Sequence, residues 1–567
     1  MEPVFYRKNK NNIFPYLQSE LNLYSPQNYI PLYEKLFVLN ETNKNSINLN
    51  NKWEICKIDE NIGDKIYKCT VNDICGNTRK MDIFFKFAPL IDPMRYLMGK
   101  YEDIKIECLP YKNNNDDCVE KMLDQNNLAY IDQFFSYLSS RLLHEYGFIH
   151  GIDYYGGYLG IKNNLILNIE DDIDYLMNSS FFHRSREDLF VISNEVYKDY
   201  FNQSARNKSK LNIEGPSKNI TLSSIEDITD NCTVSCIEIP DLSPELICEF
   251  DVSDCSKNTV DSDSKSSCSS RSSLTEEGDE HKDREEYEED EENEENEEDE
   301  EENEEEEEDE TDDEEDSPVN ITINKFPVNV IALEACHDTF DNLIESDISW
   351  TETMSAFMQI IMTLIVYQKA FNFTHNDLHT NNIMYVETEK QYIYYCYEGV
   401  YYKVPTFKRL FKIIDFGRAI YKYNGNIYCS DSFHPNGDAA TQYNCEPYLN
   451  EKKPRLEPNS SFDLCRLACS LYDNLVDDEE DPNIYNPLRI LMNEWCMDDK
   501  NRNILYKKDG EERYPEFKLY KMIARTVHKH IPKDQLNRDI FKNYIVSKKS
   551  ISKKAKILNI DNIPCMI

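Results

Sequence analysis

Two stretches of the chain have the hydrophobic spacing of long helices. Between Leu128 and Tyr146, apolar residues recur at three- and four-residue intervals that place them on one stripe of a helix, and Gly147 is a typical helix-ending residue. Between Trp350 and Phe371, apolar residues fall on nearly every side. We therefore predict one helix that covers a core and a second helix that is buried inside one.

Strand patterns surround the first helix. From Trp53 the chain alternates strands and turns, which predicts a small antiparallel sheet, and later runs predict one more strand and a hairpin that turns at Glu398-Gly399. The segments are 53–63, 64–71 and 80–87 in the sheet, 151–160 and 162–169 as further strands with a turn, 326–336 as the later strand, and 393–407 as the hairpin. This mixture predicts an α+β fold.

A long polar segment interrupts the pattern. Residues 171–318 contain a Ser-rich run and then an acidic tract from Thr275 to Asp316. With so few apolar side chains and so much like charge, burial cannot offset chain entropy, so we predict a largely disordered insertion. The predicted organisation is an extension over 1–50, a sheet-containing part over 51–170, the insertion over 171–318, the end of the sheet-containing part over 319–345, and a helical part with a C-terminal tail over 346–567.

The negative charge of the chain is concentrated in the acidic tract. The tract carries 32 Asp and Glu residues against Lys282 and Arg284, a net charge of −30, which leaves −14 for the other 525 residues. An acidic balance argues against direct binding of nucleic acid, which depends on Lys and Arg, and it favours basic protein partners. We interpret the tract either as a solvated linker or as an arm that holds basic proteins near an active site, with Ser273 as a site for acid-directed phosphorylation.

The sequence predicts neither export nor a membrane span. The N-terminus lacks the apolar core of a signal peptide, and the most apolar window, 357–366, is too short to cross a bilayer. The 18 cysteines are scattered, without two CxxC units at zinc spacing. We interpret them as reduced thiols, which predicts an intracellular protein.

The residues with the clearest chemistry follow the second helix. The stretch FNFTHNDLHTNNIM places His375, Asp377 and Asn382 at the spacing H-x-D-x-x-x-x-N. At this spacing in phosphoryl-transfer enzymes, the Asp accepts the proton of the acceptor hydroxyl and the Asn holds a metal ion. A short apolar strand then leads to Asp415, the first residue of a DFG triplet and a second candidate metal ligand. The two motifs in this order predict phosphoryl transfer.

A lysine in the first sheet is the candidate phosphate contact. Lys86 lies between Phe85 and Phe87 on a strand whose inner face would bury it, and a buried ammonium requires an anionic partner. The alternative is a lysine that reaches solvent from the sheet edge. The first half of the 128–146 helix contains no Glu, so Asp132 is our candidate partner, with Glu120 as the second choice. The alternative is an Asp132 that faces solvent and has no partner.

The loop that would cover the phosphates is poor in glycine. Only Gly63 stands in the segment before Lys86 where a G-x-G-x-x-G loop would be expected. Glycines let backbone N–H groups approach phosphates closely, so a single glycine predicts a looser cover and weaker nucleotide binding.

These motifs resemble the protein kinase superfamily, and HNDLHTNNIM together with YYKVPTFKRLFKIIDFGRAI is similar to the serine/threonine-protein kinases of large nucleocytoplasmic DNA viruses. The resemblance implies a two-lobed fold, with a small antiparallel β lobe that carries the insertion and a mainly α-helical lobe. It further implies that ATP binds between the lobes with Mg²⁺, that a Ser or Thr of a protein is the acceptor, and that the host cytoplasm or the virion is the location.

The resemblance also assigns roles to individual residues. Asp377 would be the base, Asn382 and Asp415 the Mg²⁺ ligands, and Lys86 the contact to the α and β phosphates. The backbone from Glu334 to Cys336 would meet the adenine edge. Asp463, at the start of a helix over 462–471, would brace the catalytic loop through backbone N–H groups; the alternative is an ordinary first-turn aspartate of that helix.

Two positions depart from the protein-kinase pattern. Asn376 replaces the Arg that gathers a phosphorylated activation loop, so we predict no such switch. His379 stands where protein kinases place a Lys near the γ-phosphate, and it supplies positive charge there only when protonated. Because H-x-D-L-H-x-x-N is also typical of small-molecule kinases, a small-molecule kinase on the same fold stays an alternative. A catalytically weak pseudokinase scaffold, whose acidic arm binds basic proteins, is the second alternative.

Overall fold

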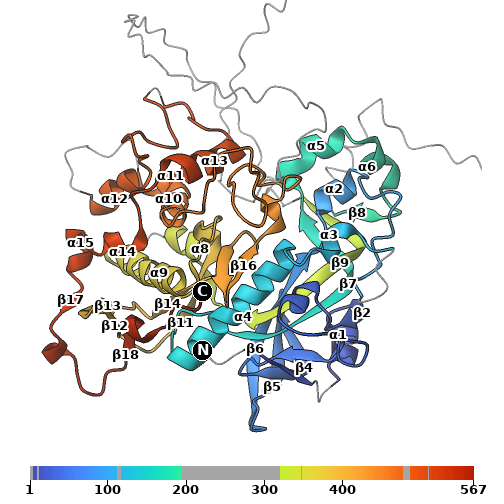
Figure 1. The fold of residues 1–567 in the computed structure, drawn as a ribbon, viewed down its shortest axis with the longest axis horizontal. Helices are drawn as coiled ribbons and strands as arrows, with labels where there is room; N and C mark the ends of the chain where they lie inside the picture. The colour runs from blue at the N-terminus through green and yellow to red at the C-terminus, as the bar shows by residue number, and fades with distance from the viewer. Residues whose placement is uncertain are drawn as a thin grey trace, which may run out of the picture. The chain divides into compact units, whose positions relative to one another are not determined.

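The computed structural model describes residues 4–8, 12–111, 117–193, 319–346, 348–476, 486–508 and 510–567 (Figure 1). The Ser-rich run, Ser273 and the acidic tract lie outside the described residues. The predictions of disorder, of a tethering arm and of phosphorylation in that segment therefore stay predictions.

A seven-stranded sheet forms the first half of the described chain. All of its strand pairs are antiparallel, in the order β2-β7-β9-β6-β5-β4, and β8 pairs with β9 beyond that path. The strands are β2 (Leu23–Gln27), β4 (Glu54–Gly63), β5 (Ile66–Asn72), β6 (Thr78–Pro89), β7 (Tyr154–Asn168), β8 (Phe190–Ile192) and β9 (Asn320–Glu334). The three predicted strands after Trp53 and the predicted strand before Cys336 are confirmed.

The prediction of two strands with a turn between 151 and 169 was wrong, because β7 runs through this stretch as one strand. Two glycines of this strand allow close packing. A Cβ on Gly157 would lie 2.3 Å from the side chain of Gln133, and a Cβ on Gly160 would lie 2.4 Å from that of Leu23. These glycines let the helix that contains Gln133 and the neighbouring strand β2 pack closely against β7.

Segments at both ends of the first half extend the sheet. The predicted N-terminal extension contributes β2 and also contains α1 (Phe14–Glu20) and a separate pair of strands, β1 (Tyr6–Lys8) and β3 (Ile47–Leu49). The start of the predicted insertion contributes β8, after α5 (Ile173–Met177) and α6 (Ser180–Ser185). Ordered structure therefore continues about twenty residues past the predicted boundary at 171, to residue 193.

Helix α4 (Leu128–Tyr146) lies against this sheet and is almost wholly buried, as its hydrophobic stripe predicted (Figure 1). The Asn127 side chain caps its first turn by accepting a hydrogen bond from Ala129 N–H, and Gly147 ends it with a positive φ of 67°. The side chain of Asn329 on β9 donates to the carbonyl of Ala129 at 2.8 Å. The first turn of α4 is thereby tied to the sheet. The described residues between β6 and α4 include the short helices α2 (Pro93–Leu97) and α3 (Glu120–Leu123).

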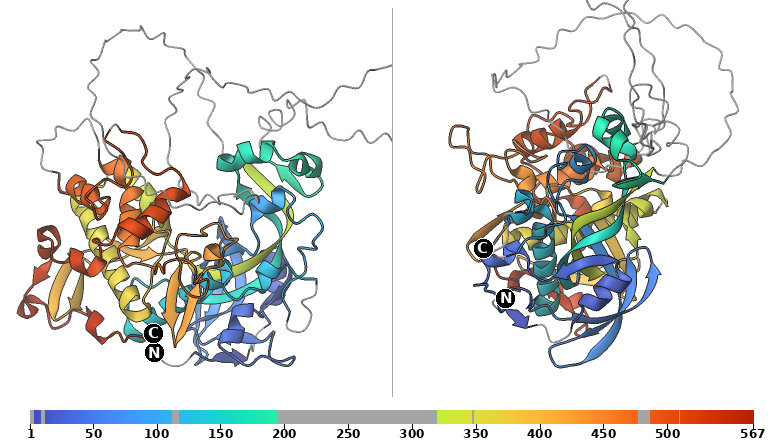
Figure 2. Two further views of the ribbon diagram at one scale, coloured as in Figure 1. Left: turned by 45° about the horizontal axis from the view of Figure 1, so that its top comes forward. Right: turned by 90° about the vertical axis from the view of Figure 1, so that its right-hand side faces the viewer.

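The second half of the chain is built around α9 (Trp350–Phe371), which is buried along most of its length, as predicted. Although α9 is long and apolar enough to cross a membrane, 89% of its most apolar window is buried by the rest of the protein. The other helices are α8 (Phe340–Glu345), α10 (Phe462–Cys469), α11 (Tyr472–Leu475), α12 (Pro487–Trp495), α13 (Phe517–Thr526), α14 (Pro532–Gln535) and α15 (Asp539–Lys542). Figure 2 shows them gathered near α9.

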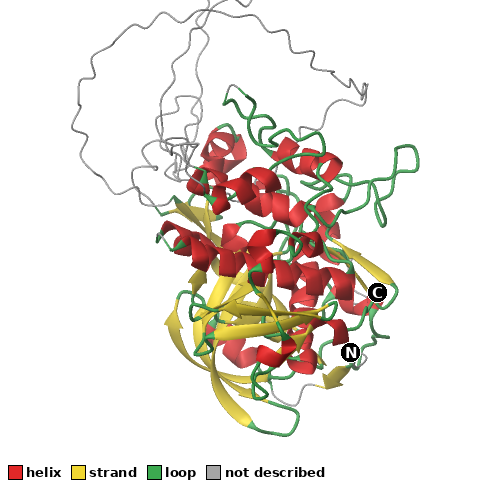
Figure 3. Ribbon diagram, turned by 90° about the vertical axis from the view of Figure 1, so that its left-hand side faces the viewer, coloured by secondary structure: helices red, strands yellow, loops and turns green. Residues whose placement is uncertain are grey.

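This second half contains more strands than a mainly helical part predicts. The hairpin that turns at Glu398-Gly399 is confirmed, and it belongs to a four-stranded sheet that includes strands close to the C-terminus. The strands are β10 (Asp338–Thr339), β11 (Ile383–Glu387) and β14 (Arg409–Ile413) in one sheet; β12 (Tyr392–Tyr397), β13 (Val400–Pro405), β17 (Ile545–Val546) and β18 (Ile557–Asn559) in a second; and the pair β15 (Ile420–Tyr423) and β16 (Asn426–Cys429). Helices and mainly antiparallel sheets together make an α+β fold, as predicted (Figure 3).

Candidate active site

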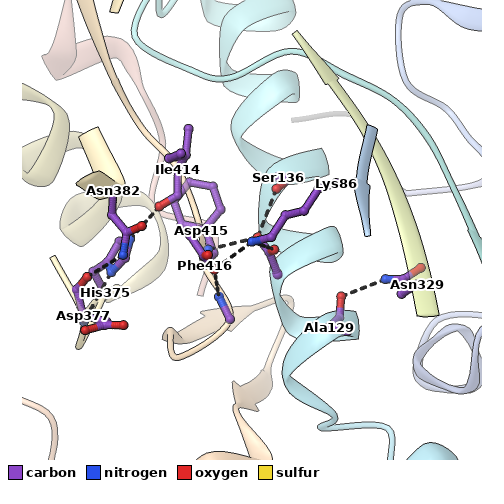
Figure 4. A network of polar contacts seen from close by, with 12 residues as sticks. Lys86, Ala129, Ser136, Asn329, His375, Asp377, Asn382, Ile414, Asp415 and Phe416 are labelled. Atoms are coloured by element: carbon purple, nitrogen blue, oxygen red, sulfur yellow. Dashed lines mark hydrogen bonds and ion pairs between the residues drawn. The ribbon is translucent and has the colours of Figure 1, made fainter. Parts of the chain in front are cut away.

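Lys86, Asp132 and Asp415 meet in one ion-paired group, in which Figure 4 labels Lys86 and Asp415. Lys86 on β6 places its Nζ 2.7 Å from Asp132 Oδ2 on α4 and 2.8 Å from Asp415 Oδ1. The second oxygen of Asp132 accepts a hydrogen bond from the Phe416 N–H at 2.9 Å. Asp132 is therefore the partner of Lys86, as predicted, and it also holds the backbone that follows Asp415.

The charges of this group are strongly coupled. Burial works against the ammonium of Lys86, but the two carboxylates outweigh burial and raise its pKa. Burial raises the pKa of Asp132 despite the nearby ammonium. For Asp415 burial is outweighed by Lys86, which lowers the pKa to about 2. The Asp415 side chain is also 45% exposed, so this ionised carboxylate faces solvent.

The loop after α9 is held by Asp463, the first-turn aspartate of α10. The N–H groups of His375 and Asn376 both donate to the Asp463 carboxylate at 3.0 Å, which confirms the predicted brace. Two unsatisfied buried N–H groups would be costly, so this carboxylate supports the loop conformation. Asn376 has a positive φ of 66°, and its side chain accepts from the Tyr443 hydroxyl at 2.7 Å.

His375 joins this loop to the strand that leads to Asp415. Its Nε2–H donates to the carbonyl of Ile414 at 2.9 Å, and its Nδ1 accepts from the Asp377 N–H at 3.3 Å. One neutral tautomer satisfies both bonds. Phe416, which follows Asp415, is buried, and its ring centroid lies 4.6 Å from the ring centroid of Phe135 on α4. The two motifs and α4 thus form one packed unit.

Asn382 is oriented with its amide nitrogen turned inward. Its Nδ2 donates to the Asp377 carbonyl at 2.9 Å and lies 3.0 Å from His379 Nε2. Among the described residues no donor reaches Asn382 Oδ1, so this oxygen is free to accept. The same residues contain no cluster of three or more His, Cys, Asp or Glu side chains suited to a metal ion. One amide oxygen and one carboxylate fit the few protein ligands that Mg²⁺ takes when phosphates complete its shell.

Asp377 lies among cations and a tyrosine that the sequence did not point to. The Tyr520 hydroxyl on α13 donates to Asp377 Oδ1 at 2.8 Å, and Arg466 Nε donates to that hydroxyl at 3.0 Å. Burial alone would raise the pKa of Asp377, but Arg418, His379 and Arg466 lower it below its usual value. Asp377 is therefore ionised, and one of its two carboxylate oxygens already accepts a hydrogen bond.

His379 lies close to Asn382 but does not supply positive charge. Burial lowers its pKa to about 4, against the attraction of Asp377. The ring is therefore neutral near pH 7, and it would supply positive charge beside a γ-phosphate only at lower pH. Its Nδ1 is buried and has no hydrogen-bond partner among the described residues.

The remaining predicted residues lie apart from the Lys86 group. Gly63 ends β4 at the exposed hairpin turn to β5, where its N–H donates to Asn61 Oδ1 at 3.0 Å. Glu334 ends β9, where its N–H donates to the Asp153 carbonyl at 3.0 Å and its carboxylate pairs with Lys412 at 2.6 Å. Cys336 follows two residues later, and burial raises the pKa of its thiol to about 12.

A cavity of about 370 Å³ lies elsewhere, lined by residues 146, 147, 149, 390–394 and 555–558. None of the predicted site residues belongs to its lining. The candidate site is thus defined by side-chain geometry around Lys86, Asp377 and Asp415.

No protein-family model matches the sequence, and no curated protein sequence is significantly similar to it.

Proposed function

We propose that the protein is an ATP- and Mg²⁺-dependent kinase with a two-lobed, protein-kinase-like fold. In this proposal the seven-stranded sheet and α4 form one lobe, and the part built around α9 forms the other. The observation that carries the proposal is the meeting of Lys86, Asp132 and Asp415 from three separate elements, with Asp377 and Asn382 on the adjoining loop (Figure 4). Lys86, Asp377, Asn382 and Asp415 stand in motifs that predict phosphoryl transfer, and Asp132 is the partner that the α4 sequence predicts for Lys86.

The proposed roles follow from the charges of the side chains. Lys86 binds the α and β phosphates, and Asp132 keeps its ammonium in place. Asp377 accepts the proton of the acceptor hydroxyl, since it is ionised and lies next to a hydroxyl donor. Asn382 and Asp415 hold Mg²⁺, which when bound neutralises phosphate charge.

The proposed acceptor is a Ser or Thr hydroxyl of a protein, with basic proteins as the class that the acidic chain favours. This choice rests on the family resemblance of the motifs. A small alcohol is the competing acceptor, and it belongs in the same experiment as a separate arm.

The test is transfer of labelled γ-phosphate from Mg²⁺-ATP by the purified chain to basic proteins, acidic proteins and small alcohols. Asp377→Asn removes the base, so transfer should fall by about 10²–10⁴-fold. Asp539→Asn is the matched control, because it makes the same change at an exposed aspartate of α15 and should leave transfer unchanged. Label that persists in Asp377→Asn, or no label on any acceptor, would contradict the proposal.

A further inference from the structure

Tyr520 holds a hydroxyl at the position that an acceptor hydroxyl would need. Its oxygen lies 2.8 Å from Asp377 Oδ1 and donates to it. A general base must lie within about 2.6–3.2 Å of the group it deprotonates, and Tyr520 meets this requirement without any movement of the chain. The hydroxyl thus already occupies one of the two carboxylate oxygens of the proposed base.

The ring of Tyr520 is fixed by contacts on several sides. It stacks on Phe517 at 5.4 Å between centroids, and the guanidinium groups of Arg466 and Arg418 lie 5.1 and 5.8 Å from its centre. Arg466 Nε also donates to the Tyr520 hydroxyl at 3.0 Å. Packing and cation–π contacts therefore direct this hydroxyl toward Asp377.

We propose that Tyr520 is a phosphate acceptor of the protein itself, modified in cis at the site around Asp377. The inference rests on the proposed kinase function and names one acceptor for it. In the step, the Tyr520 oxygen attacks the γ-phosphorus of ATP and an O–P bond forms. The bond from that phosphorus to the β–γ bridging oxygen breaks, ADP leaves with the electron pair, and the phenol proton passes to Asp377.

The surroundings of Tyr520 also suit the product. A phosphate on this oxygen would carry close to two negative charges, and Arg466 already donates to the same oxygen. Arg418 is ion-paired with Asp438 and lies beside the ring, so a second guanidinium is within the group. The Asp377 carboxylate would repel the new phosphate. Modification therefore breaks the hydrogen bond that covers Asp377, which frees the base for a separate acceptor.

Tyrosine 520 can be distinguished from a tyrosine that only positions Asp377. The full chain is incubated with Mg²⁺-ATP and a basic protein acceptor, and phosphorylated residues are identified by peptide mass spectrometry. We expect phosphate on Tyr520, formed with the same first-order rate constant at every protein concentration, and no phosphate there in Asp377→Asn. Tyr514→Phe is the matched control: its ring packs under Lys518 Nζ at 5.7 Å, and its loss should leave Tyr520 modification unchanged.

The possible results separate this inference from the proposed function. Label on the added protein with Tyr520 unmodified would overturn the inference and leave the kinase function standing. No label on any acceptor would overturn both. A rate constant that rises with protein concentration, or label on Tyr520 in Asp377→Asn, would also overturn modification in cis. The Tyr520→Phe variant keeps the ring but removes both the phosphosite and the hydrogen bond to Asp377. It should carry no phosphate at position 520 and should label the added protein without the delay that modification of Tyr520 would impose, with its thermal unfolding midpoint checked against the wild type.

Discussion

Asp415 and Asp377 are both ionised carboxylates of the candidate site, but their surroundings differ in charge. Asp415 shares a single ammonium, that of Lys86, with Asp132, so two anions face one cation. Asp377 has two guanidinium groups nearby, and one of them also pairs with Asp438, so charges there are balanced. Asp415 is partly exposed, whereas Asp377 is buried.

This difference indicates what each carboxylate can do. An exposed carboxylate in a group with excess negative charge is suited to a cation, and Asn382 offers a free amide oxygen on the adjoining loop. Asp377 is a buried carboxylate whose charge is balanced by nearby guanidinium groups and which already accepts a hydrogen bond from a hydroxyl, so it is suited to proton transfer. The comparison therefore supports the proposed metal site at Asp415 and the proposed base at Asp377.

The largest effect should come from removing the shared ammonium. Lys86→Met leaves Asp132 and Asp415 facing each other, so we expect phosphate transfer to fall by about a hundredfold or more. The free energy of unfolding should fall by about 3 kcal/mol, because a buried charge loses its partner. Transfer kinetics and urea unfolding measure the two effects.

Two further variants sharpen this prediction. Adding Asp132→Asn to Lys86→Met should restore part of the stability and none of the transfer, since the repulsion disappears but the phosphate contact does not return. Lys412→Met is the matched control, because it removes a buried ammonium that pairs with Glu334. Equal losses of transfer per folded molecule in Lys86→Met and Lys412→Met would contradict a special role for the Lys86 group.

The sequence predicted the partners of Asp415 more completely than the partners of Asp377. Asp132 could be chosen because it lies in the first half of a clearly periodic helix that has no Glu there. Tyr520 could not, because it lies 143 residues from Asp377 and only the tertiary fold brings them together. Arg418 left a weak signal, as a cation three residues after Asp415, and Arg466 stands three residues after Asp463.

The fold shows the same limit. Helices α4 and α9 and strands β4 to β6 followed from local hydrophobic patterns. The addition of β2 and β8 to the sheet depends on pairing with distant strands, which no local pattern reports. The single strand β7 was predicted as two strands, and the close contacts that its glycines make with Gln133 and Leu23 depend on the tertiary fold.

The smallest effect should be the pH dependence of transfer. His379 titrates at about 4 and the pKa of Asp377 is lowered, so the maximal rate should show no step near pH 6.5. His379→Gln should have the same profile between pH 5 and 8, within about a factor of two. A step in the maximal rate near pH 6.5 that is absent in His379→Gln would contradict this prediction, because it would show that protonation of His379 affects transfer.

The same pKa predicts a stability effect with a definite sign. The unfolded chain binds a proton at His379 near pH 6.5, whereas the folded chain does so near pH 4. The contribution of the neutral ring is therefore complete above about pH 6.5 and is lost as the pH falls toward 4. His379→Gln should weaken that part of the acid dependence in urea unfolding.

The most direct test of the central claim is calorimetric titration of ATP into the chain with and without Mg²⁺. We predict that Mg²⁺ strengthens ATP binding in the wild type and in Asp377→Asn, and that Asp415→Asn removes this gain. Asp377→Asn is the informative partner, because it removes the same charge from the balanced group. An equal loss of the Mg²⁺ effect in both variants, or ATP binding that does not depend on Mg²⁺, would contradict the assignment of metal to Asp415 and base to Asp377.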